Sequence, residues 1–181
     1  MSLPLTAAVA LAVLLTFWII GAYNRLVAMR NAVAAAWARL QETLDQRGAA
    51  VEPLVSALRE PMSSEQGALD TWLAAHAAAT RAASAMSTLP LSPAHAQAWV
   101  AAEGLLGAAA SRVLALLDQQ AELSAEPAVA RLRTSWLDGQ ERLPFARQFF
   151  NDSAQAHNEA AAAFPTQLVA AGFGLGPVGQ V

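Results

Sequence analysis

The sequence contains no cysteine and no lysine, and only 14% of its 181 residues are charged. The absence of cysteine excludes disulfide bonds, thiolate metal sites and a cysteine nucleophile. Arginine supplies all 11 residues of the combined lysine and arginine count, and the formal net charge is -3 at pH 7. Nucleic-acid-binding proteins usually carry a basic patch or stripe, so we expect no nucleic-acid partner.

The motifs of common catalytic and cofactor sites are also missing. The three histidines, His76, His95 and His157, lie far apart and do not follow the H-x-x-x-H or H-E-x-x-H spacing of metal sites. The sequence has neither a phosphate-binding loop nor a G-x-S-x-G nucleophile motif. We therefore expect no enzymatic activity, no catalytic residues, no cofactor and no metal site.

A long uncharged apolar run lies near the N-terminus, from Leu3 to Ala22. As a helix it would extend about 30 Å, which is the thickness of the hydrocarbon core of a bilayer. A cleavable signal usually has a charged start and a shorter apolar stretch, and a helix buried in a soluble domain is rarely apolar on every face. We therefore predict a transmembrane anchor at residues 1–22, rather than a signal or a core helix.

Basic residues follow this run and none precedes it. Arg25, Arg30 and Arg39 come directly after the apolar stretch. The positive-inside rule places such arginines on the cytoplasmic side. We expect a single-pass protein of the bacterial inner membrane, with its N-terminus outside and its body in the cytoplasm.

The remainder of the sequence has the periodicity of amphipathic helices. Apolar residues recur at steps of three and four, as in coiled coils, and no stretch alternates with period two. Gly48 and Pro53 mark a weak point in the first helix. The pattern predicts an all-α fold: an N-terminal transmembrane helix followed by an antiparallel up-down four-helix bundle. We place the bundle at residues 23–165 and a flexible glycine-rich tail at 166–181, with helices over 23–59, 65–88, 93–123 and 127–163.

Two segments of this sequence follow the pattern of a known family. The first, YNRLVAMRNAVAAAWARLQETLDQR, begins at Tyr23, and the second, ERLPFARQFFNDSAQAHNEAAAAFPTQLVAAGF, begins at Glu141. Together they resemble the LemA family. The matching positions are Tyr23, Asn24, Leu26, Val27, Arg30, Asn31, Val33, Ala36, Trp37, Leu40, Leu44 and Arg47 in the first segment, and Ala146, Arg147, Asn151, Asp152, Asn158, Phe164, Pro165, Leu168 and Ala170 in the second.

The resemblance implies a single-pass bacterial membrane protein with a four-helix antiparallel bundle, and it implies no known reaction. The sequence departs from the family at residues 49–52, where AAVE replaces D-L-I-P and the proline is displaced to Pro53. It also has Phe150 and His157 where the family has tyrosine. We interpret the chain as a divergent member.

Four asparagines form two pairs with a spacing of seven, which places each pair on one helix face. One antiparallel register sets Asn24 against Asn158 and Asn31 against Asn151. We interpret these amides as polar contacts that fix the register of the first and last helices. Alternatively they form a pocket or docking site at the membrane end, or a solvated surface. The candidate interhelix polar cluster consists of Asn24, Arg30, Asn31, Arg147, Asn151, Asp152 and Asn158.

These features fit two functions. The first is a membrane-anchored adaptor or scaffold, whose partners are the lipid bilayer and other membrane or envelope proteins; self-association stays open. The alternative is a sensor of a small molecule or of envelope stress, which uses the polar cluster at the membrane-proximal end of the bundle.

Overall fold

The computed structural model describes residues 3–88 and 92–181, and within them it contains helices and no strands. The prediction of an all-helical fold is therefore confirmed. The turn expected near residues 89–91 lies outside the described residues. The elements are α1 (Leu3–Gly48), α2 (Val51–Leu58), the short 3-10 helix η1 (Ser63–Glu65), α3 (Gln66–Thr88), α4 (Pro93–Asp118), α5 (Ala121–Ser124), α6 (Pro127–Ala162) and α7 (Thr166–Gly172).

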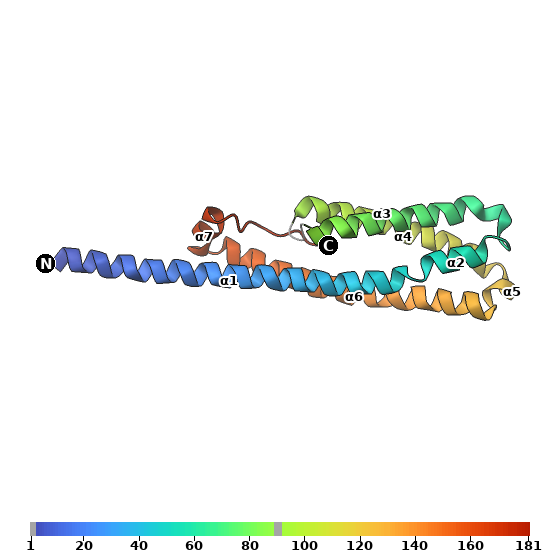
Figure 1. Ribbon diagram of the computed structural model, residues 1–181, viewed down its shortest axis with the longest axis horizontal. Coiled ribbons are helices and arrows are strands. Elements are labelled where there is room, and N and C mark those ends of the chain that lie inside the picture. Colours follow the sequence, from blue (N-terminus) through green and yellow to red (C-terminus); the bar gives the residue numbers. More distant parts are fainter. Residues whose placement is uncertain (1–2, 89–91) are drawn as a thin grey trace.

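Helix α1 is a single helix of 46 residues, and its first part is apolar on all sides. Every residue from 5 to 21 is exposed, including large side chains such as Leu14 and Phe17. Figure 1 shows this part extending alone beyond the other helices. It is long and apolar enough to cross a membrane, as predicted. Helix α4 also passes that test of length and composition, but part of it is buried in the body.

The long helices lie along one axis as two closely packed pairs (Figure 1). Helix α6 runs antiparallel to α1 along its packed part, and α4 packs antiparallel to α3. Helix α2 contacts both α3 and α6, so it joins the two pairs. We refer to the structure after the apolar part of α1, residues 23–181, as the helical body.

The first predicted helix is interrupted, because Ala49 and Ala50 separate α1 from α2. Pro53 is the third residue of α2. Its missing N–H belongs to the first turn, where backbone donors have no partner within the helix. The weak point expected at Gly48 and Pro53 is therefore a two-residue interruption of the helix, between Gly48 and Val51.

Tryptophan side chains fill much of the core. Trp37 and Trp99 pack edge to face with ring centroids 5.5 Å apart, and Trp72 and Trp136 do the same at 5.4 Å. All four are buried. Such aromatic pairs contribute about 0.5–1.5 kcal/mol beyond their burial.

The segment predicted as a flexible glycine-rich tail, residues 166–181, begins with a further helix. Residues 166–172 form α7. After it, Gly174 has φ 66°, and the Leu175 N–H donates a hydrogen bond back to the Ala170 carbonyl at 2.9 Å. This is the pattern of a Schellman helix end, which glycine favours. Leu175 and Val178 beyond it are buried. The glycine-rich segment therefore follows a defined course along the body, with a turn at Gly174.

Candidate functional site

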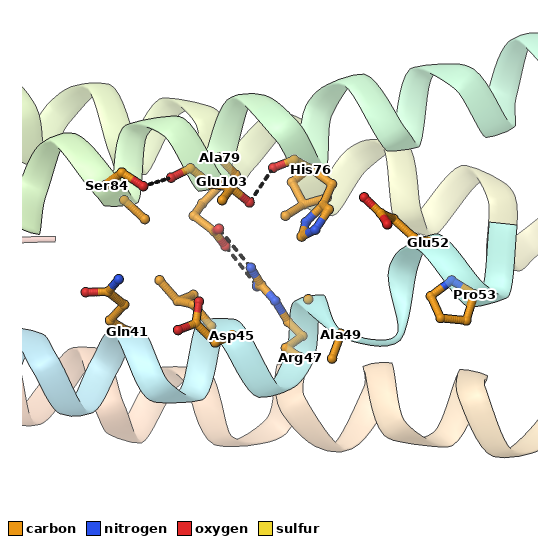
Figure 2. Close-up of a pocket in the computed structure, with 15 residues that line it drawn as sticks. Gln41, Asp45, Arg47, Ala49, Glu52, Pro53, His76, Ala79, Ser84 and Glu103 are labelled. Carbon is orange, nitrogen blue, oxygen red and sulfur yellow. Dashed lines mark hydrogen bonds and ion pairs between the residues drawn. The ribbon is translucent and has the colours of Figure 1, made fainter. Parts of the chain in front are cut away.

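A buried ion pair lies in the middle of the body, at the level of the helix break. Arg47, near the end of α1, donates two hydrogen bonds to Glu103 of α4, both at 2.8 Å (Figure 2). Arg47 is 3% exposed and Glu103 is 6% exposed. Arg47 also donates to the side-chain oxygen of Gln140 at 2.7 Å. The pair therefore connects α1, α4 and α6 through charge-assisted bonds, which are stronger than neutral ones.

Two tryptophans cover the cations around Glu103. The guanidinium of Arg47 lies 5.0 Å from the ring centroid of Trp136, and that of Arg147 lies 4.7 Å from Trp99. Arg147 also approaches the Glu103 carboxylate to 3.9 Å. Burial lowers the pKa of Arg147, and Arg47 lowers it further, while Glu103 opposes both effects. One carboxylate thus faces two partly desolvated cations.

Glycine permits the close approach of α6 to this site. A Cβ atom on Gly139 would lie 2.6 Å from the Cβ of Arg47, which is closer than side chains pack. With glycine at this position, α6 can pass directly over Arg47. The adjacent Gln140 is thereby placed within hydrogen-bonding distance of the guanidinium.

An open cavity of about 390 Å³ lies beside the ion pair, at the break between α1 and α2 (Figure 2). His76 of α3 lines it, and Asp45 and Glu52 bring carboxylates to the same space. Burial lowers the pKa of His76, and Arg47 lowers it further, against weaker opposing effects of Glu52 and Glu103. The imidazole is therefore neutral at neutral pH, and the cavity offers hydrogen-bonding groups to a polar molecule.

Sequence reasoning missed the site at Arg47 and Glu103, although a signal was present. Arg47 interrupts the apolar stripe of the first helix. Glu103 lies between Trp99 and Leu106 at steps of four and three, on the stripe of α4. A charged residue on each of two apolar stripes is rarely buried unless it is paired. That spacing alone therefore indicates a buried pair.

The seven residues of the candidate polar cluster have different partners in the structure. Asn24 and Asn31 are exposed on α1. The side chains of Asn151 and Asn158 bond to the backbone of the tail, at Val181 and Val178. Helices α1 and α6 are neighbours, as the predicted register requires. The amides of α6 bond to the tail, and among the described residues they form no hydrogen bond with Asn24 or Asn31.

The charged members of that cluster also have separate partners. Arg30 donates to the carbonyl oxygen of Gly174 at 3.5 Å, so it contacts the tail. Arg147 belongs to the buried site at Glu103. Asp152 is exposed and accepts a hydrogen bond from Gln148 at 2.6 Å. Among residues 3–88 and 92–181, no three His, Asp or Glu side chains gather in a way that could hold a metal ion.

Comparison with known proteins supports the resemblance found in the sequence. No curated protein matches this chain. The family model described as the LemA family matches residues 36–179, which include the site at Arg47 and Glu103 and most of the tail. Because this match covers most of the chain, the protein belongs to the LemA family.

Proposed function

We propose that this protein is a membrane-anchored adaptor, which acts by binding other membrane or envelope proteins and catalyses no reaction. Residues 3–22 cross the bacterial inner membrane, and the long helices form one up-down four-helix bundle that stands on this anchor in the cytoplasm. The observation that carries the proposal is the continuity of α1 from Leu3 to Gly48. The exposed apolar part and the packed part are one rigid rod, which fixes the body at the membrane surface.

The end of the body near the apolar part of α1 supports this placement. The rings of Tyr23 and Phe173 lie 5.0 Å apart, so the end of α7 lies beside the point where α1 would leave the bilayer. Phe164 and Leu168, just before and within α7, are 77% and 64% exposed. Aromatic and apolar side chains are enriched at membrane interfaces. They fit a surface that rests on lipid.

Anchoring is tested by the variant Leu11→Arg. An arginine at the centre of a membrane span raises the free energy of insertion by about 3 kcal/mol, roughly a hundredfold in partition. We expect this variant to leave the carbonate-washed membrane fraction. Leu105→Arg, at an exposed position on α4, adds the same charge to the body and is the matched control. Equal retention of both variants in the membrane would contradict the proposal.

Orientation is tested directly because the chain has no cysteine. A single cysteine at the exposed Thr71 of α3 reports the side of the membrane on which the body lies. We expect a membrane-impermeant maleimide to label it only after the inner membrane is broken. Labelling in intact spheroplasts would place the body outside.

The adaptor role is tested with a photocrosslinking phenylalanine at Phe145, an aromatic residue of α6 that is 79% exposed. We expect an adduct of defined mass in native membranes, and we expect it to disappear in the Leu11→Arg background. The absence of an adduct, or an adduct that persists without anchoring, would argue against presentation at the membrane.

A second candidate function is sensing of a small molecule, and the cavity beside His76 favours it. The cavity lies at the helix break in the middle of the body, away from the membrane-proximal cluster first considered. Thr80→Trp places a large ring at its lining. If the protein is a sensor, native mass spectrometry should detect a bound small molecule that the variant loses.

A further inference from the structure

The last residues of the chain lie in a groove between α6 and the start of α4. A Cβ atom on Gly179 would stand 2.8 Å from the Cα of Pro93 and 2.8 Å from the Cβ of Ala96, so the chain passes tightly against α4. On its other side it bonds to Asn151 and Asn158 of α6. In Figure 1 this segment leaves α7 and runs back along the body toward α4. We call residues 173–181 the tail and this site the tail groove.

Each asparagine binds the main chain of one tail residue through two hydrogen bonds. The Asn158 amide donates to the Val178 carbonyl at 2.9 Å and accepts from the Val178 N–H at 2.7 Å. The Asn151 amide donates to the Val181 carbonyl at 2.6 Å and accepts from the Val181 N–H at 2.8 Å. These contacts involve only backbone atoms of the tail. They are therefore open to any residue of suitable conformation.

The spacing of the two asparagines selects an extended segment. Seven residues of an α-helix rise about 10.5 Å. Three residues of an extended chain span about 10 Å. The steps from Asn151 to Asn158 and from Val181 to Val178 therefore match, with the tail running antiparallel to α6. A helical segment would advance only about 4.5 Å over three residues and would not reach both amides.

The side chains of the tail define which sequences fit. Val178 is 4% exposed and packs in the cluster around Trp99 and Phe150. Gly179 has no space for a Cβ atom. Gln180 is exposed, and Val181 packs partly against the same cluster. The groove therefore accepts the pattern apolar–glycine–any residue–apolar.

We propose that the tail groove is a docking site for an extended segment of a partner protein with this pattern, and that the tail occupies it in the absence of the partner. The inference rests on the proposed adaptor function, to which it adds the binding surface. Peptide recognition by main-chain hydrogen bonds gains affinity from the backbone and specificity from side-chain pockets. The tail shows that the groove supplies both.

The contacts of the tail allow such an exchange. A partner segment with the same pattern replaces each hydrogen bond and each buried valine in kind. Gly176 and Pro177 are exposed between the buried Leu175 and Val178, so residues 176–181 can leave the groove while Leu175 and the turn at Gly174 stay in place. A tethered tail competes at an effective concentration in the millimolar range. Free peptide therefore binds the full chain weakly, and removal of the tail exposes the groove.

Fluorescence anisotropy with a labelled peptide, GLGPVGQV (residues 174–181), tests the proposal on the full-length protein and on a chain that ends at Phe173, both in detergent micelles. We expect saturable binding to the shortened chain that is at least tenfold tighter than to the full chain. Asn158→Ala in the protein, or Gly179→Val in the peptide, should weaken it at least tenfold. Gln180→Ala in the peptide, at the exposed position, is the matched control and should have little effect.

If the shortened chain does not fold, as judged by circular dichroism, full-length Gly179→Val serves in its place, because it expels the tail without shortening the chain. Absence of saturable binding to a folded variant overturns the proposal, and so does binding that Asn158→Ala leaves unchanged. If the full-length protein forms dimers by exchanging tails, the occupant of the groove is a second copy of this chain, and the proposal of a different partner protein is overturned. Crosslinking at Phe145 tests the adaptor role separately, so the adaptor function and the docking site in the tail groove can each fail while the other stands.

Discussion

Removal of Glu103 provides the strongest test of how the body is held together. In the folded protein its carboxylate accepts two hydrogen bonds from Arg47 and lies 3.9 Å from Arg147. Glu103→Ala leaves Arg47 with the amide oxygen of Gln140 and the ring of Trp136. It also leaves two guanidinium groups, which already disfavour each other, without the anion between them.

The expected loss follows from the burial of these charges. Breaking a buried ion pair by removing one partner costs about 3–5 kcal/mol, because the remaining charge stays desolvated. The double variant Arg47→Met with Glu103→Leu removes both charges and keeps apolar volume. Its free energy of unfolding should lie within about 1 kcal/mol of that of the natural protein, or above it. Replacing a buried pair with apolar residues is often neutral or stabilising.

Urea unfolding in detergent micelles, followed by tryptophan fluorescence, measures the free energy of unfolding of Glu103→Ala and of the double variant. Asp70→Ala is the control, since Asp70 pairs with Arg59 at 2.8 Å on the exposed surface. Such surface pairs contribute about 0–1 kcal/mol. If Glu103→Ala is no more destabilising than Asp70→Ala, the reasoning from the buried pair is refuted.

Two further predictions use the same unfolding assay. Gly139→Ala should destabilise the protein by about 1–3 kcal/mol, because its Cβ atom would overlap Arg47. The control Gly104→Ala has nothing within 4 Å of the added Cβ atom and should stabilise α4 by about 0.5–1 kcal/mol. Equal effects of the two variants would contradict the close approach of α6 to Arg47. Because the pKa of His76 is lowered below 6.5 by burial and by Arg47, the unfolded chain binds its proton first, and stability should fall as the pH drops below about 6.5. His76→Gln should remove this part of the pH dependence. If the natural protein and the variant show identical profiles of stability against pH between about pH 8 and 5, this role of His76 is excluded.

Much of the helical order is determined locally and was predictable. Ser92 caps α4, accepting from the His95 N–H at 3.4 Å, and Pro93 opens the helix, as the residue types indicate. The apolar run from Leu3 forms the start of one helix, because its length and lack of charge are properties of the segment itself. The position of the break near Gly48 was also indicated by residue type. Its full extent was not, because propensity locates a weak point without fixing how far the helices separate.

The amino-acid sequence alone determined that Asn151 and Asn158 share a face of one helix, since a spacing of seven is a local property of the α-helix. Only the tertiary structure decided what they bind. The backbone groups of α1 are already satisfied within that helix, whereas an extended tail outside any sheet has unpaired N–H and C=O groups that need partners when buried. A carboxamide offers one donor and one acceptor in the required geometry, so both asparagines hold Val178 and Val181. That choice depends on where the chain returns, which no local pattern records.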